Sequence, residues 1–140
     1  MNIDSIVNGV VIDHISAGKA LEIYNMLSMD KLECQVAIIQ NAHSNKMGKK
    51  DIIKIDGEFE INLDAIGYVD PGATIVFIKN GDLVEKKKLD LPKRITNVIL
   101  CKNPRCITST EQELPHVFNL TDEKHRIYRC LYCEAKAERK

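Results

Sequence analysis

The sequence predicts an α+β protein whose last third is a separate, cysteine-rich β domain. Two observations lead to this prediction. Strand-like and helix-like segments alternate between residues 9 and 88, and four of the five cysteines lie in the last forty residues. The alternation is typical of helices packed on one face of a mostly antiparallel sheet, and the paired cysteines are typical of a metal site.

The first strand is expected over residues 10–15, a run rich in β-branched side chains. Ser16 is the expected N-cap of the helix that follows, because apolar residues then recur at helical spacing at Ala20, Leu21, Tyr24 and Leu27. A second strand is expected over residues 34–39, which would make Cys34 a small core side chain.

A polar loop is predicted over residues 41–48, ahead of a third strand at 51–55. Gly57 indicates a turn, and a short helix capped by Asn62 is expected over residues 63–66 before Pro71 and Gly72 interrupt it. Strands at 73–79 and 83–89 flank Asn80-Gly81-Asp82, a hairpin signal. This order, β-α-β-β-α-β-β, predicts a ferredoxin-like βαββαβ sandwich with an added strand.

A lysine-rich stretch and Pro92 indicate a linker, after which residues 95–100 are expected to form a strand that leads into Cys101. The remainder is too small for a sufficient core of its own, and domains of this size commonly need a metal. The second part is therefore predicted to be a small zinc-bound β domain.

The metal site is predicted from cysteine spacing. Four residues lie between Cys101 and Cys106, two lie between Cys130 and Cys133, and 23 residues separate the pairs. Two such turns can place four thiolates around one tetrahedral zinc ion, and four protein ligands leave no open position for catalysis. The alternatives are two disulfides or four buried thiols. His116 and His125 lie between the pairs and are expected to be surface or packing residues.

The charge balance is unlike that of a nucleic-acid binder. Twenty basic and twenty acidic residues cancel, and tryptophan is absent, so the chain has neither a basic excess nor much material for base stacking. No apolar run is long enough to span a bilayer, and the first residues do not form a secretory signal. We therefore expect a cytoplasmic protein with no membrane or nucleic-acid partner.

An enzyme is also not expected, because the first part lacks the nucleophile elbow, the Walker A loop and the dinucleotide glycine pattern. Asp13 and His14 are adjacent, but neighbouring strand residues point to opposite faces, which argues against an acid–base pair. Lys54 and the run Lys86–Lys88 are candidate phosphate-binding groups, although ordinary exposed lysines look the same.

Three stretches and the cysteine pairs resemble the aspartate carbamoyltransferase regulatory chain. The stretches are GVVIDHI from Gly9, MGKKDIIKI from Met47 and LPKRITNV from Leu91, followed directly by the two cysteine pairs. The resemblance runs in order from about Ile3 to Cys133. The sequence departs from the family pattern at Val76 and Gly81.

The resemblance implies a non-catalytic regulatory chain of pyrimidine biosynthesis. Residues 1–91 would be a nucleotide-binding allosteric domain for effectors such as CTP and ATP, and residues 92–140 a zinc domain that docks on the catalytic chain. The family's regulatory chains also pair into dimers through their N-terminal domains. The metal ligands would be Cys101, Cys106, Cys130 and Cys133.

Matched residue by residue, the implied effector site comprises a ribose acceptor, two groups near the triphosphate, a lysine that reaches base and ribose, and several backbone contacts. In this sequence they are Asp13, His14, Lys86, Lys54, Ile3, Asp4, Ser5, Ile6, Ile52 and Leu83. Two other hypotheses remain beside this one: a zinc-ribbon nucleic-acid-binding protein, which the neutral charge disfavours, and an enzyme acting at Asp13 and His14.

Overall fold

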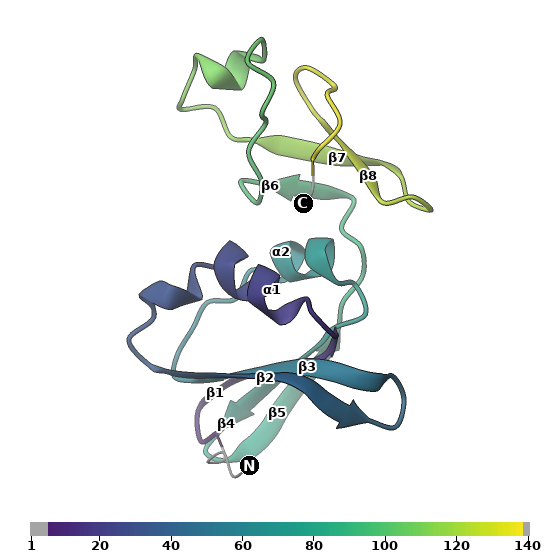
Figure 1. The fold of residues 1–140 in the computed structure, drawn as a ribbon. Coiled ribbons are helices and arrows are strands. Elements are labelled where there is room, and N and C mark those ends of the chain that lie inside the picture. The colour runs from purple at the N-terminus through teal and green to yellow at the C-terminus, as the bar shows by residue number, and fades with distance from the viewer. Residues whose placement is uncertain (1–5, 139–140) are drawn as a thin grey trace. The chain divides into compact units, whose positions relative to one another are not determined.

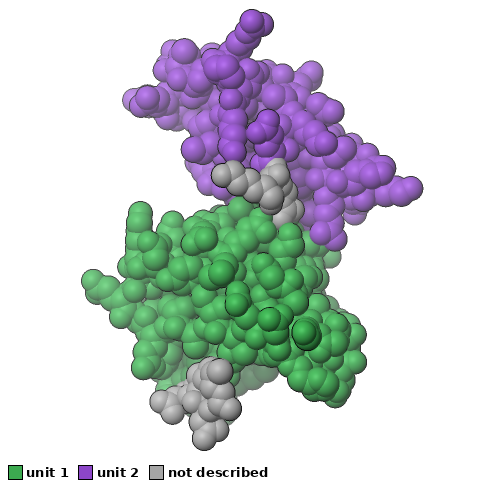
Figure 2. Space-filling view, viewed as in Figure 1, with its two compact units in different colours: residues 1–90 green, residues 91–140 purple. Residues whose placement is uncertain are grey.

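A computed structural model describes residues 6–138 of the chain. The chain divides into two compact units, residues 1–90 and 91–140 (Figure 2). Among the described residues, the first unit contains a five-stranded sheet and the second a three-stranded sheet. No described helix is long and apolar enough to cross a membrane.

The first unit has two helices and a 3-10 turn between its strands. Its elements are β1 (Gly9–Ser16), α1 (Ala20–Met26), η1 (Met29–Lys31), β2 (Gln35–Ser44), β3 (Gly48–Asp56), α2 (Leu63–Val69), β4 (Thr74–Lys79) and β5 (Asp82–Lys88). The sheet order is β2-β3-β1-β4-β5, and every neighbouring pair is antiparallel. This is the ferredoxin-like order with β5 added at the edge, so the predicted fold class is confirmed.

Both helices lie on the same face of this sheet (Figure 1). The strand side chains on that face are almost fully buried, among them Val10, Ile12, Ile15, Ile53, Ile55 and Ile75. Opposite them, α1 buries Ala20 and Ile23, and α2 buries Ala65, Ile66 and Val69. Removal of this apolar surface from water, at about 25 cal/mol per Å², is the main force that joins helices and sheet. Because successive strand side chains point to opposite faces of a sheet, every second strand residue faces away from the helices.

The two helices begin differently. Asn62 caps α2 as predicted, because its Oδ1 accepts a hydrogen bond from the Ala65 N–H at 3.2 Å. The prediction of Ser16 as the cap of α1 is wrong: Ser16 is the last residue of β1, and Lys19 precedes the helix without a side-chain cap. Asp51, from β3, instead accepts hydrogen bonds from the N–H of Ala20, the first residue of the helix, and from the N–H of Gly18 just before it.

The predicted polar loop over residues 41–48 is also wrong. Strand β2 continues to Ser44 and β3 starts at Gly48, so only a three-residue turn joins them. The polar residues form the end of a hairpin where few side chains meet the core, so they show no apolar alternation. Cys34 precedes β2 and is half-exposed. It packs closely against Gly57: a Cβ atom added to Gly57 would lie only 2.6 Å from the Cys34 Cβ.

The second unit is a three-stranded antiparallel sheet with one 3-10 turn. Its elements are β6 (Arg94–Thr96), η2 (Ile107–Ser109), β7 (Val117–Asp122) and β8 (Ile127–Cys130), with β7 in the centre of the sheet. Ile95, Val117, Phe118 and Tyr128 form its small core. The strand expected over residues 95–100 is shorter, because Asn97 adopts a left-handed conformation with φ 57° and the chain leaves the sheet there.

Candidate metal centre and charged sheet face

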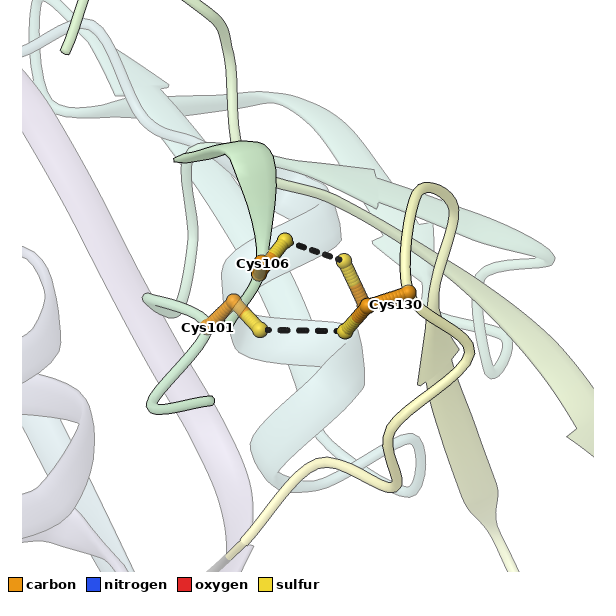
Figure 3. Close-up of side chains that lie close together, drawn as sticks. Cys101, Cys106 and Cys130 are labelled. Atoms are coloured by element: carbon orange, nitrogen blue, oxygen red, sulfur yellow. Dashed lines mark hydrogen bonds between the residues drawn. The ribbon is translucent and has the colours of Figure 1, made fainter. Parts of the chain in front are cut away.

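Four cysteines come together at one end of the second unit. Cys101 and Cys106 flank a turn in which the Cys106 N–H donates to the Asn103 carbonyl at 3.0 Å. Cys130 ends β8. Its N–H donates to the Ala135 carbonyl, and its own carbonyl accepts from the Glu134 N–H. These two bonds close a turn that places Cys133 beside Cys130. Figure 3 shows the thiols of Cys101, Cys106 and Cys130 turned toward a common centre.

The sulfur positions fit a tetrahedral metal ion. The Cys101 and Cys133 sulfurs are 3.6 Å apart, those of Cys106 and Cys130 are 3.7 Å apart, and all four lie within 4.8 Å of one another. Zinc–sulfur bonds of about 2.3 Å predict sulfur–sulfur distances of about 3.8 Å. A disulfide needs about 2.05 Å, so the four cysteines are free thiols that together fit one structural zinc.

Two groups of Thr108 donate to the Cys106 sulfur and lower the pKa of that thiol: the Thr108 hydroxyl, 3.1 Å away, and the Thr108 backbone N–H. At Cys133 burial opposes ionisation, but hydrogen bonds from Asn103, Ala135 and Cys101 lower its pKa to about 7. Burial raises the pKa of Cys101 to about 12. Cysteine binds a metal as the thiolate, and four neighbouring thiolates repel one another. A divalent cation at their centre offsets this repulsion.

The two histidines between the cysteine pairs behave differently. His125 is exposed and pairs with Asp122 at 2.8 Å. His116 is half-buried, and its Nδ1 accepts a hydrogen bond from the Cys101 N–H at 3.0 Å. Neither belongs to the sulfur cluster, but His116 supports one of its ligands directly. The contact between His116 and Cys101 could not be predicted from the sequence, because 15 residues separate them.

The second candidate site is the face of the five-stranded sheet that points away from the helices. Directly paired residues share a face, and one row across the sheet runs Ala37, Lys54, Val11, Val76, Lys86. Ile52, Asp13 and Leu83 lie one pleat away, on the same face. The strand register thus brings together residues from all five strands of this sheet that are up to 75 residues apart in sequence.

Asp13 is an acidic side chain of this face and lies at a β-bulge. The pairing of β1 with β3 shifts between Ile12 and Ile15, and His14 takes a left-handed conformation with φ 56°. The Lys50 ammonium contacts the Asp13 carboxylate at 2.9 Å, and the His14 N–H donates to it at 2.6 Å. Burial opposes ionisation of Asp13, but these contacts outweigh it and lower its pKa, so the carboxylate is charged at neutral pH.

The bulge overturns one expectation from the sequence. Asp13 and His14 do not diverge as neighbours in a regular strand would: His14 Nδ1 lies 3.9 Å from Asp13 Oδ2. That nitrogen is buried and has no hydrogen-bond partner among residues 6–138. A bulge adds one residue to a strand, so the alternation of faces fails locally.

The other residues of the implied effector site have varied positions. Leu83 is exposed, Ile52 is half-buried and Ile6 is buried. Ile3, Asp4 and Ser5 lie outside the described residues. Gly81, one of the two departures from the family pattern, has φ +81° in the β4–β5 turn, and its N–H donates to the Val7 carbonyl at 2.8 Å. Val76, the other departure, lies in the row between Val11 and Lys86.

Sequence reasoning missed Lys50 at this face, whereas Lys88 belongs to the lysine run that was already a candidate phosphate-binding group. Lys50 contacts Asp13, and Lys88 pairs with Thr74, the residue opposite Asp13 on β4. The signal was present: residues 50, 52 and 54 have the same parity along β3, as have 86 and 88 along β5. Four basic side chains, those of Lys50, Lys54, Lys86 and Lys88, therefore share this face with the carboxylates of Asp13 and of Asp56 at the end of β3.

Comparisons with known proteins match both units. Residues 1–90 match the family described as aspartate carbamoyltransferase regulatory chain, allosteric domain, and residues 93–140 match its metal binding domain. Similar curated proteins are named aspartate carbamoyltransferase regulatory chain. The one from Clostridium botulinum strain Hall is 52% identical over 96% of this chain and 92% of its own length. The relative from Clostridium tetani is 47% identical over 96% and 94%, and that from Bifidobacterium longum 41% over 99% of both.

Proposed function

The chain belongs to the aspartate carbamoyltransferase regulatory-chain family, and on that premise we propose that its first unit binds a nucleotide effector while its second unit docks on the catalytic chain. It is a regulatory chain with an allosteric and a metal-binding domain, not a catalytic chain. The proposal assigns the nucleotide to residues 1–91 and docking to residues 92–140. Such a chain would act in the cytoplasm, in pyrimidine biosynthesis.

The observation that supports nucleotide binding best is the mixture of charges on the open sheet face. Lys54 and Lys86 face the same side from β3 and β5, Lys88 lies on the neighbouring row, and the Lys50 ammonium reaches Asp13 from the row beyond. Ammonium groups neutralise phosphates, and the ionised Asp13 carboxylate can accept hydrogen bonds from ribose hydroxyls. Half-exposed apolar side chains between them offer a surface for a base.

Within this site each residue has a proposed role. His14, with its buried and unpaired Nδ1, and Lys86 would contact the triphosphate. Lys54 would reach ribose and base, Ile52 would pack against the nucleoside, and Leu83 would offer its backbone to a phosphate. The segment Ile3, Asp4, Ser5 and Ile6 would contribute backbone contacts to ribose and base.

Calorimetry with CTP and with ATP tests this site. Lys86→Ala should weaken binding of the triphosphate about tenfold or more, a typical loss for a charge-assisted hydrogen bond of 1.5–3 kcal/mol. Lys87→Ala is a matched control, because Lys87 is the next residue of the same exposed strand and faces the other side, over the Phe77 ring. Equal losses in both variants would remove Lys86 from the site.

The docking proposal is supported by apolar side chains that surround the metal centre. Leu100 precedes the first cysteine, Ile107 follows the second, and Leu131 and Tyr132 lie between the last two; all four are exposed. Exposed apolar residues grouped on a small domain commonly belong to an interface with another protein. The zinc would hold the two turns that present them.

Assembly with the catalytic chain, measured by size-exclusion chromatography, tests docking. Leu131→Ser should weaken the complex while the second unit stays folded, and Cys101→Ser should abolish it by loss of zinc. His125→Ala, an exposed change at the β7–β8 turn, should assemble normally. A full-sized complex with Cys101→Ser would contradict the docking role.

Allosteric control then requires that effector occupancy and catalytic activity be coupled. Couplings of this type are about 1–3 kcal/mol and are reciprocal between sites for binding. The proposal also includes pairing of two regulatory chains through their first units. Tight, salt-dependent binding of DNA or RNA by the zinc-loaded chain, with no response to nucleotides, would favour the nucleic-acid hypothesis instead.

A further inference from the structure

We propose that Asp51, a side chain on the helix-facing side of β3, is a positioning residue for the effector face on the other side of the sheet. This inference rests on the proposed nucleotide-binding function and adds a residue to it. Asp51 would not touch the ligand. Its carboxylate would fix the strand bulge that carries Asp13 and His14.

The carboxylate is fully buried, with 0% of the residue exposed. It accepts three backbone hydrogen bonds from two segments distant in sequence. Oδ2 accepts from the N–H groups of Gly18 at 2.9 Å and Ala20 at 3.2 Å, and Oδ1 accepts from the N–H of Asn41 at 3.0 Å. Both carboxylate oxygens are needed to accept these three hydrogen bonds.

These contacts place Asp51 between two irregularities of the sheet. On one side, β1 departs from regular pairing between Ile12 and Ile15; on the other, β2 does so between Ile39 and Ala42. Each bulge contains a non-glycine residue in the left-handed region, His14 with φ 56° and Asn41 with φ 59°. Such conformations persist only where surrounding contacts impose them. Asp51 supplies one such contact to β2 directly and another to the chain just after β1.

The residues beside Asp51 connect it to the effector face. Because strand side chains alternate, Lys50 and Ile52 point to the face opposite Asp51. Lys50 contacts Asp13 at 2.9 Å, and Asp13 accepts the His14 N–H at 2.6 Å. Movement of the β1 bulge would therefore displace Asp13 and His14 together from Lys50 and Lys54.

Asp51→Asn is the informative variant, because it keeps the size but replaces one acceptor oxygen by a donor NH₂ group. In either orientation of the amide, its NH₂ group faces at least one backbone N–H, and two donors cannot hydrogen-bond to each other. The control is a substitution of Ile66, a buried residue of α2 without a polar contact, to Val or Ala, chosen to match the melting temperature of Asp51→Asn.

The experiment measures CTP and ATP affinity of the zinc-loaded chain by calorimetry, together with the ¹H–¹⁵N spectrum. We expect Asp51→Asn to lose at least tenfold in affinity and to shift the His14 amide signal, while the Ile66 control stays within twofold and keeps that signal. Native affinity in Asp51→Asn, or equal losses in both variants, would overturn the inference. A wild-type chain that binds neither nucleotide would instead overturn the proposed function, and the His14 signal would still decide whether Asp51 fixes the bulge.

Wild-type protein provides a second test if Asp51→Asn does not fold. Reciprocity requires that a ligand favouring the fixed bulge also strengthen the hydrogen bonds that fix it. Saturating nucleotide should slow hydrogen exchange at Gly18, Ala20 and Asn41 at least tenfold more than at the amides of α2. Unchanged relative exchange would overturn the positioning role.

Discussion

Residues outside the four cysteines determine how the metal ligands are presented. Thr108 donates to the Cys106 sulfur, and His116 accepts from the backbone of Cys101. The second contact ties the first cysteine turn to the segment before β7, where His116 and Asn97 also exchange hydrogen bonds. Groups that orient metal ligands typically change metal affinity by about 10–100-fold when they are removed.

His116→Ala should therefore increase the rate of zinc release and lower zinc affinity by about tenfold or more, because the Cys101 N–H loses its acceptor. A chromogenic chelator that competes for the metal measures both quantities. His125→Ala is the control: it removes a histidine of the same unit whose ring contacts Asp122 and not the backbone of a metal ligand. Identical zinc release from the two variants would show that His116 does not support the centre.

At the scale of elements, the two helices show two ways to satisfy N-terminal N–H groups. Helix α2 relies on Asn62, its own preceding residue, whereas α1 relies on Asp51 from a strand 31 residues beyond Ala20. A local cap can be recognised from residue type and position. A cap supplied by tertiary structure cannot, and this explains why Asn62 was predicted correctly and Ser16 was not.

Asn62→Ala should lower the free energy of unfolding of the first unit by about 1 kcal/mol, the usual cost of a lost N-cap. Urea unfolding monitored by circular dichroism measures the change. Asn25→Ala, at an exposed position inside α1, makes the same chemical change without removal of a cap and should have little effect or stabilise slightly. Equal destabilisation by both changes would contradict the role of Asn62.

At the scale of the whole molecule, the two units depend on different sources of stability. The first has a two-layer core with helices over a five-stranded sheet. The second has a three-stranded sheet and few buried apolar residues, of which Cys106 and Cys130 are themselves metal ligands. A domain this small commonly needs a metal to fold.

Removal of zinc with a chelator should unfold the second unit and leave the first folded, because metal binding contributes on the order of 10 kcal/mol to such modules. The ¹H–¹⁵N spectrum should lose the dispersed signals of β7 and β8 and keep those of β1 and β3. Added zinc should restore them. Persistence of the β7 signals in excess chelator would show that the core suffices without metal.

The sequence by itself determined the features that depend on local pattern. Runs of β-branched residues, helical spacing of apolar residues and turn signals predicted the order of strands and helices. Cysteine spacing predicted a four-thiolate zinc site; the fold class and the metal are confirmed. Family resemblance added the proposed effector residues. These signals are readable because a strand repeats every two residues, a helix every 3.6, and a metal turn brings ligands together within a few positions.

Only the tertiary structure decided where the pattern breaks. The bulge at Asp13 and His14 reverses the expected divergence of their side chains, Lys50 joins Asp13, and Asp51 caps a helix that begins on another segment. His116 reaches Cys101 across 15 residues. Each feature depends on a hydrogen bond or register shift between segments distant in sequence, and such contacts leave no periodic trace because no local repeat produces them.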